Sequence, residues 1–434
     1  MLTMKGRKPT NKGGGERPTM LHTLKIATSD LEVGMYVSGL DRPWLETPFM
    51  MQGFRVESAE DVDEVRNYCQ HVFIDFTKSR QKDHPLLRRR LSANGSVPLK
   101  DIFPGRPLKA YTTTGAWKEE SAQAWLVLDS LVDDVNAIFG HILDGGTLNV
   151  IRLKKSVDPV VESMTRNPDA CIWLARLKQH DQYAYQHSIS ASIWAVAMGR
   201  QLGLPRHDLR SLAVGCMLMD VGKLRVNPEL LQSPRSLNED EAELMREHVA
   251  KGLEIVRESG IQNKDVLDIV AHHHERHDGS GYPQGLAGND IPPFARIAAI
   301  VDTYDAVTSD RNHQQAISPS AAIKLLYNAR NIDFQAELVE SFIQAIGVYP
   351  AGTIVELSSG EIGVVVSEYR TRRLKPRIVV LLDANKNRLR EPQTIDLHAL
   401  AESAARQDLA IARSLEPNAY GINLAELDIP SVTS

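Results

Sequence analysis

The sequence predicts a multidomain α+β protein with a small N-terminal α/β domain, a central all-α domain and a small C-terminal β unit. Three patterns predict this class. Apolar residues alternate in short runs from about residue 23, recur near the 3.6-residue helical period over about 116–348, and return to a period of two after residue 349. The length of 434 residues allows two or three domains, each with its own core.

The N-terminal third divides into three segments. Residues 1–22 contain Lys, Arg and three consecutive glycines but no apolar stretch, so we expect disorder rather than a secretory signal. Residues 23–80 are predicted to form an α/β domain, with alternating strands and a helical pattern at 61–68. Residues 81–115 are first basic and then rich in proline and glycine, which is typical of a linker.

The rest of the chain is predicted from its changes of period. Connecting helices are expected over 116–160 and a helical domain over 161–348. A small antiparallel β unit is expected over 349–398, where runs of Val, Ile and Leu alternate with turn residues. The segment 399–434 is predicted to be a terminal helix, at 401–415, followed by a loose tail.

The composition excludes several classes of function. The formal net charge of −5 is unfavourable for coating nucleic acid, which requires clustered Lys and Arg, although a small phosphate ligand remains compatible. No window approaches the roughly 18 apolar residues of a membrane span. The three cysteines lack metal-site spacing and indicate reduced, buried thiols. We therefore expect a soluble cytoplasmic protein that binds neither nucleic acid nor a bilayer.

A histidine cluster carries the clearest chemical signal. The chain has 14 histidines, and four of them fall within six positions, at His272, His273, His274 and His277. The residues just before them are apolar at helical spacing, and Gly281-Tyr282-Pro283 follows them as a turn. A solvated loop has little reason for such a cluster. The pattern indicates a metal-dependent phosphohydrolase, because imidazole and carboxylate groups are ligands for iron, manganese, nickel or zinc.

The motif resembles the HD-GYP family, which are bacterial phosphodiesterases that open cyclic di-GMP at two or three metal ions in a helical domain. Further motifs match in the family's order and approximate spacing: Tyr185-Gln186-His187-Ser188, Leu218-Met219-Asp220-Val221-Gly222-Lys223, Glu247-His248 and Asp302 in its alanine-rich segment. Any one of these residues alone is typical of a capping or core group. The resemblance implies an HD-type phosphohydrolase domain that cuts one or both phosphodiester bonds of cyclic di-GMP, with pGpG or GMP as the product.

The resemblance also implies the metal ligands. One ion is held by Asp220, His248, His273 and His274, and Asp220 bridges to a second ion held by His187 and Asp302. The fourth ligand of that second ion is a histidine in the family but Met219 here, whose soft thioether is a poor ligand for a hard, oxygen-rich site. Two divalent ions such as iron or manganese are expected, or a single ion if nothing replaces the missing histidine.

Lys223 and Arg311 are the basic residues implied to bind substrate phosphate. Lys223 follows the catalytic Asp220 by one helical turn, so its ammonium can lie over the phosphate and take part in catalysis, although a solvated lysine is the simpler alternative. The family's second basic position beside Arg311 is Gln314 here, which lowers the positive charge offered to the substrate.

The turn formed by Gly281, Tyr282 and Pro283 is preshaped by its glycine and proline. In the family this loop shapes the substrate site and contacts diguanylate cyclase domains. Tyr282 either stacks on guanine or fills the core. The segment 41–54 resembles an uncharacterised domain often fused to HD-GYP proteins, and its role is open, as is homodimerisation.

Three functions remain in view. The leading hypothesis is a cyclic di-GMP phosphodiesterase. Because of Met219 and Gln314, the first alternative is a catalytically impaired module that binds cyclic di-GMP or a partner protein and regulates it. The second alternative is a phosphohydrolase of another nucleotide, since the sequence contains no base-reading signature.

Overall fold

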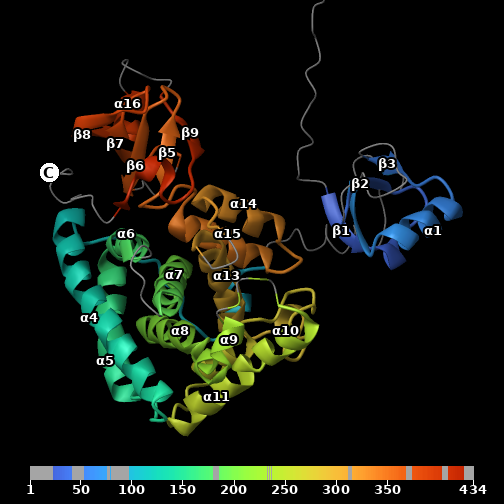
Figure 1. Cartoon of the computed structure of the whole chain (residues 1–434), viewed down its shortest axis with the longest axis horizontal. Helices are drawn as coiled ribbons and strands as arrows, with labels where there is room; N and C mark the ends of the chain where they lie inside the picture. Colours follow the sequence, from blue (N-terminus) through green and yellow to red (C-terminus); the bar gives the residue numbers. More distant parts are fainter. Residues whose placement is uncertain are drawn as a thin grey trace, which may run out of the picture. The chain divides into compact units, whose positions relative to one another are not determined.

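The computed structural model divides the chain into two compact units, Met1–Ser96 and Val97–Ser434, which are described separately (Figure 1). The residues that the structure describes are 23–41, 53–75, 79, 97–178, 185–231, 233, 235, 237–310, 315–367, 374–402 and 409–424. The predicted disorder of residues 1–22 and residues 42–52 of the resemblance at 41–54 lie outside the described residues.

The first unit is a four-stranded antiparallel sheet with one helix, which confirms the small α/β domain. Its sheet has the strand order β1-β4-β2-β3. Ser58 caps the helix and accepts a hydrogen bond from the Asp61 backbone, while the Asp61 carboxylate accepts one from the Ser58 backbone. The elements are β1 (Thr23–Ala27), η2 (Thr28–Asp30), β2 (Tyr36–Leu40), β3 (Phe54–Arg55), α1 (Ala59–Tyr68) and β4 (His71–Asp75).

The linker predicted over 81–115 is wrong in its second half, because this part packs on the helical domain. Helix α3 (Leu99–Ile102) begins there, and Phe103 is fully buried in the main core. The Arg106 guanidinium is paired with two aspartates of the helical domain, one of them Asp265 at 2.8 Å. Prolines and glycines made the segment look like a linker, but its apolar and charged residues have partners more than a hundred positions away.

The helical domain of the second unit confirms the all-α prediction. Helices α4 and α5 run side by side at one edge, and α7 and α13 lie in the middle (Figure 1). Almost every residue of α7 is buried, which explains why its sequence is apolar or small on all sides. Among the described residues no helix is long and apolar enough to span a bilayer. The helices are α4 (Trp117–Leu143), α5 (Val150–Arg166), α6 (Pro168–Lys178), α7 (Gln186–Leu202), α8 (Arg206–Leu218), η4 (Val221–Arg225), α9 (Pro228–Leu231), α10 (Glu239–Arg246), α11 (His248–Glu258), α12 (Lys264–His272), η5 (Gly288–Asp290), α13 (Pro293–Thr308), α14 (Pro319–Asn328) and α15 (Ala336–Ile346).

The C-terminal part is a five-stranded antiparallel sheet with the order β8-β7-β6-β5-β9, which confirms the β unit. The side chains on the two faces of this sheet belong to different hydrophobic cores. Alternate residues such as Ile354 and Val364 join the core of the helical domain, whereas Val355 and Val365 join a small separate core. The elements are β5 (Ile354–Leu357), β6 (Ile362–Ser367), β7 (Arg377–Leu382), β8 (Arg388–Asp396), α16 (Leu397–Glu402), β9 (Ile411–Ser414) and η6 (Ala419–Gly421).

The terminal helix predicted over 401–415 is wrong. Helix α16 ends at Glu402, and Ile411–Ser414 form the edge strand β9, which pairs antiparallel with β5. The apolar residues of this segment fit a helical spacing, but a free sheet edge offers backbone donors and acceptors that a strand satisfies. Tertiary pairing therefore decides the conformation here.

Candidate metal centre

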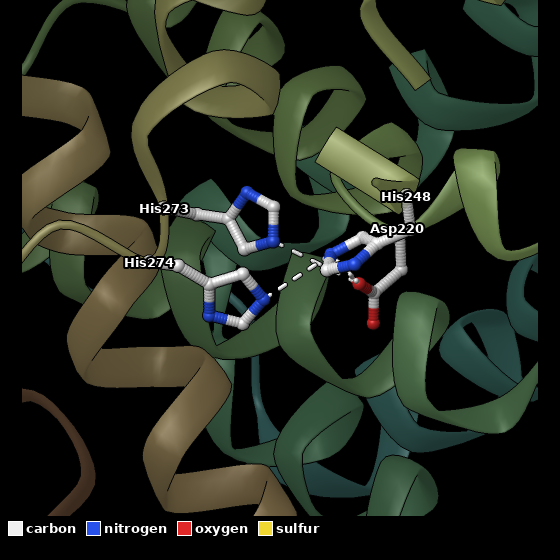
Figure 2. Close-up of side chains that lie close together, drawn as sticks. All are labelled: Asp220, His248, His273 and His274. Carbon is white, nitrogen blue, oxygen red and sulfur yellow. Dashed lines mark hydrogen bonds and ion pairs between the residues drawn. The ribbon is translucent and has the colours of Figure 1, made fainter. Parts of the chain in front are cut away.

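Six predicted ligands converge in the helical domain, although they come from five separate segments. His187 lies in the first turn of α7, Asp220 follows α8, and His248 begins α11. The ligand atoms form two groups, each within 4.8 Å, and Asp220 belongs to both: one group is Asp220, His248, His273 and His274, and the other is His187, Asp220 and Asp302. Figure 2 shows the first group, with the three imidazoles and the carboxylate converging on one point.

A close backbone contact places Asp220 against His248. A Cβ added to Gly222 would lie 1.9 Å from the His248 carbonyl oxygen and 2.4 Å from the Gly252 nitrogen, so any larger residue would force η4 away from α11. Glycine at 222 is therefore required by the approach of two backbones. The Asp-x-Gly spacing fixes the distance between a ligand on η4 and a ligand on α11.

Two imidazoles of the first group are held in the tautomer that a metal requires. His248 Nδ1 lies 2.6 Å from the Met245 carbonyl oxygen, and His273 Nδ1 lies 3.2 Å from the Ile269 carbonyl oxygen. A carbonyl only accepts, so each Nδ1 carries the proton and donates. In the neutral rings, both Nε2 atoms keep a lone pair, and they lie 3.3 and 3.7 Å from Asp220 Oδ1.

The same atoms show that the donor set fits a cation. His273 Nε2 and Asp220 Oδ1 are buried, and neither has a hydrogen-bond partner among the described residues. Two buried acceptors that face each other without a donor are costly unless a cation lies between them. Burial lowers the pKa of His274 to about 2, so this third imidazole is also neutral and offers a lone pair.

The second group is organised around His187. Its Nε2 lies 3.0 Å from Asp302 Oδ1 and 3.5 Å from Asp220 Oδ2, and its Nδ1 lies 2.8 Å from Asp305 Oδ2. Burial lowers the pKa of His187, but hydrogen bonds to Asp302 and Asp305 outweigh it and raise that pKa to about 10. Asp305 is buried and accepts a hydrogen bond from the Trp194 indole at 2.9 Å. A carboxylate behind a histidine is the usual support of a metal ligand.

Met219 leaves the second group with three ligands. It caps the C-terminal end of α8, is fully buried, and belongs to the apolar core. No histidine or acid takes its place among the described residues of that group. The first group has all four of its ligands, so the two groups offer a cation different numbers of donors.

Lys223 lies beside Asp220, the aspartate that belongs to both ligand groups. Its ammonium is 2.6 Å from Asp220 Oδ2, and its side chain is one-third exposed. Burial raises the pKa of Asp220, but the Lys223 charge and the neighbouring histidines together outweigh it and hold that pKa well below its ordinary value. Arg311 and Gln314 lie outside the described residues.

The Gly-Tyr-Pro loop folds back over the histidine pair. The Tyr282 ring stacks on His274, with centroids 4.6 Å apart, and the Tyr282 amide donates to the His274 carbonyl. The bond between Tyr282 and Pro283 is cis. A Cβ on Gly281 would lie 2.4 Å from the Arg276 nitrogen, so this glycine is required where the loop crosses the backbone of the histidine segment.

Sequence reasoning missed two buried carboxylates that support the site. Glu275 is 1% exposed and accepts hydrogen bonds from the Gln284 amide at 2.8 Å and the Leu286 amide at 3.0 Å. Asp305 is the other, behind His187. One signal was available for Asp305, because it follows Asp302 by three positions on one helix and so shares its face. The return path of the loop to Glu275 has no such signal.

Comparisons with known proteins agree with this architecture. Residues 172–337 match the HD domain family, residues 23–151 match a domain of unknown function (DUF3391), and residues 354–421 match a KOW domain associated with HD domain. The first of these matches contains all six ligands.

Curated relatives match the chain over very different lengths. The chain is 32% identical over 375 residues to a cyclic di-GMP phosphodiesterase of Pseudomonas aeruginosa, which is 86% of this chain and 88% of that protein. It is 37% identical over 150 residues to a cyclic di-GMP phosphodiesterase response regulator of Xanthomonas campestris pv. campestris (34% and 39% of the two chains). It is 31% identical over 159 residues to a 3'3'-cGAMP-specific phosphodiesterase of Vibrio cholerae serotype O1 (36% and 30%). The match to the Pseudomonas aeruginosa protein over most of both chains, together with the HD domain match, shows that the chain belongs to the HD-GYP family.

Proposed function

We propose that this protein is a metal-dependent phosphodiesterase that opens cyclic di-GMP to linear pGpG and then to GMP. The observation that carries the proposal is that Asp220 belongs to both ligand groups, because one carboxylate can then hold two cations close together. Two adjacent cations are the arrangement that hydrolyses phosphodiesters at neutral pH. The substrate is supported by the cyclic di-GMP phosphodiesterase activity of the Pseudomonas aeruginosa relative, which matches over most of both chains.

Two divalent ions such as iron or manganese suit this mixture of imidazoles and carboxylates. When bound, the metals supply a hydroxide nucleophile and neutralise the charge that builds on the phosphoryl oxygens. Hydrogen bonds within this chain orient the histidine rings for that chemistry. His248 and His273 use their Nδ1 protons on backbone carbonyls and keep Nε2 toward the centre. Asp305 holds Nδ1 of His187 in the same way.

In this proposal Lys223 binds the substrate and Tyr282 supports the metal centre. Lys223 Nζ, beside Asp220, can bind a non-bridging phosphate oxygen and stabilise it as negative charge develops. The Tyr282 ring is stacked on His274, and the Arg246 guanidinium lies 5.3 Å from its centroid. Tyr282 therefore supports a metal ligand from behind, and Arg246 adds positive charge at the rim. Arg311 is kept as a proposed phosphate ligand on the resemblance alone.

The test is chromatography of cyclic di-GMP incubated with anaerobically purified protein and Fe(II) or Mn(II). We expect pGpG, followed by GMP, with the Asp220→Ala protein producing neither. The same reaction with 3'3'-cGAMP as a competing substrate separates the two activities that the relatives carry. If cyclic di-GMP survives while the protein contains metal, the phosphodiesterase assignment is wrong.

The second candidate is an impaired module that binds cyclic di-GMP or a partner and regulates it. The three-ligand second group, with buried Met219 in place of histidine, is the observation that favours it. The Met219→His variant separates the two functions. A large gain in turnover supports the impaired site, whereas unchanged or lower turnover means that the native site already works with Met219.

The Gly-Tyr-Pro loop is also a proposed docking point for diguanylate cyclase domains in the cytoplasm. Pro283 and Gln284 are exposed at its tip, while the loop base is anchored to Glu275. An exposed tip on a fixed base is available to a partner without disturbing the metal ligands. Binding of a purified diguanylate cyclase domain to wild-type protein and to Gln284→Arg tests this role, and equal affinities would exclude it.

A further inference from the structure

Residues of α4 and α5, the two helices at one edge of the helical domain (Figure 1), line an open groove. Its volume is about 600 Å³. Leu126, Val127 and Ser130 line it from α4, and Ile151 and Lys155 line it from α5. The two helices are antiparallel and packed on each other below the groove, so its floor is closed.

Large apolar residues are exposed at both edges of the groove. The Ile151 side chain is 71% exposed and the Leu126 side chain is 65% exposed, and these are the two most exposed large apolar residues in the part of the chain that the structure describes. Single exposed apolar residues are common, but two at facing edges of one groove mark an interaction surface.

The two helices that border the groove carry opposite charges, and Asp133 lies beside the groove rather than among its lining residues. On α4, Asp133 follows Leu126 by two helical turns and is exposed on the same face. On α5, Arg152 is already paired with Asp134 at 2.6 Å, which leaves Lys155 as the cation in the groove. Neither Asp133 nor Lys155 has an ion-pair partner among the residues that the structure describes.

We propose that this groove binds the same groove of a second copy of the chain, around a two-fold axis that runs along it. Such an axis exchanges the two sides, so α4 of each copy packs on α5 of the other and Asp133 faces the partner's Lys155. An axis across the groove would instead place α4 on α4, with Asp133 facing the partner's Asp133. The opposite charges therefore select one orientation, and Leu126 and Ile151 are buried in it.

Charge reversal tests the surface and the orientation together. The full-length protein is examined by analytical ultracentrifugation, where we expect a species of twice the 48.2 kDa chain mass. Asp133→Lys or Lys155→Asp alone places like charges together twice per dimer and is expected to raise the dimer dissociation constant about tenfold or more. The double variant, and an equimolar mixture of the two single variants, restore attraction at both contacts and are expected to dimerise again.

Lys154→Asp is the matched control, because it makes the same charge change on an exposed residue of α5 that does not line the groove. It should leave the dimer intact, and circular dichroism checks that each variant folds. The proposal is overturned if the wild type is a monomer, or if neither single variant changes the dimer dissociation constant. The groove would then bind a different partner. Loss of the dimer without restoration in the double variant and the mixture overturns the orientation.

Discussion

Replacing Glu275 by Gln tests whether one buried carboxylate holds the Gly-Tyr-Pro loop over the metal centre. The native carboxylate accepts from two loop amides, at 2.8 and 3.0 Å, and is 1% exposed. Glutamine keeps the shape but replaces one acceptor oxygen by an NH₂ group, which then faces an amide N–H. Loss of one hydrogen bond to a charged group and one buried unsatisfied donor together cost about 3 kcal/mol.

Hydrogen exchange read by mass spectrometry measures this loss at the loop itself. A change of about 3 kcal/mol corresponds to roughly a hundredfold faster exchange of the Gln284 and Leu286 amides, since each 1.4 kcal/mol is about tenfold. The matched control is Glu243→Gln, where the side chain is 72% exposed and exchange should not change. The reasoning is refuted if Glu275→Gln exchanges at the wild-type rate, because other contacts would then hold the loop.

Three further changes test the metal centre, at Asp305 and Met219, and the stability of the helical domain, at Glu120. Asp305→Asn removes the carboxylate behind His187 and is expected to weaken metal binding about 10-fold to 100-fold in a chelator competition. Met219→His supplies a fourth ligand to the second group and should tighten binding of the second ion about tenfold or more in the same competition. Glu120 is 5% exposed; burial raises its pKa, but the hydrogen bonds from Arg166 and Ser163, together with the Arg166 charge, outweigh this and hold that pKa below 4.5. The folded-state pKa is lowered, so Glu120→Gln should cost about 2 kcal/mol above pH 4.5, and urea titrations should show the difference shrinking as pH falls below it.

Local patterns were sufficient for most elements of the fold, whereas the convergence of the six ligands was predicted from the resemblance to a family. Helical and strand periods are set by the side of each element that faces a core, so they can be read without knowing the partner. The ligands follow from motifs whose order matches a family. Asp220 and His248 meet because Gly222 allows two backbones to touch, and that glycine is part of the motif itself.

The predictions that failed depend on partners far away in the sequence. Arg106 fixes the segment after α3 to the helical domain through aspartates of α8 and α12. The sequence near Arg106 gives no indication of these partners. Ile411–Ser414 form a strand because β5 has an edge to pair with. Glu275 was visible in the sequence, but its role depends on where the chain returns at Gln284 and Leu286.

The two faces of the C-terminal sheet have a consequence for how this protein can evolve. Ile354, Val364 and Val379 lie in the same apolar core as the helices that carry the metal ligands. A gene rearrangement that lost this sheet would expose that core to water instead of releasing an independent module. The helical domain and the sheet are therefore expected to be inherited as one block, with the first unit as the part that recombination can exchange.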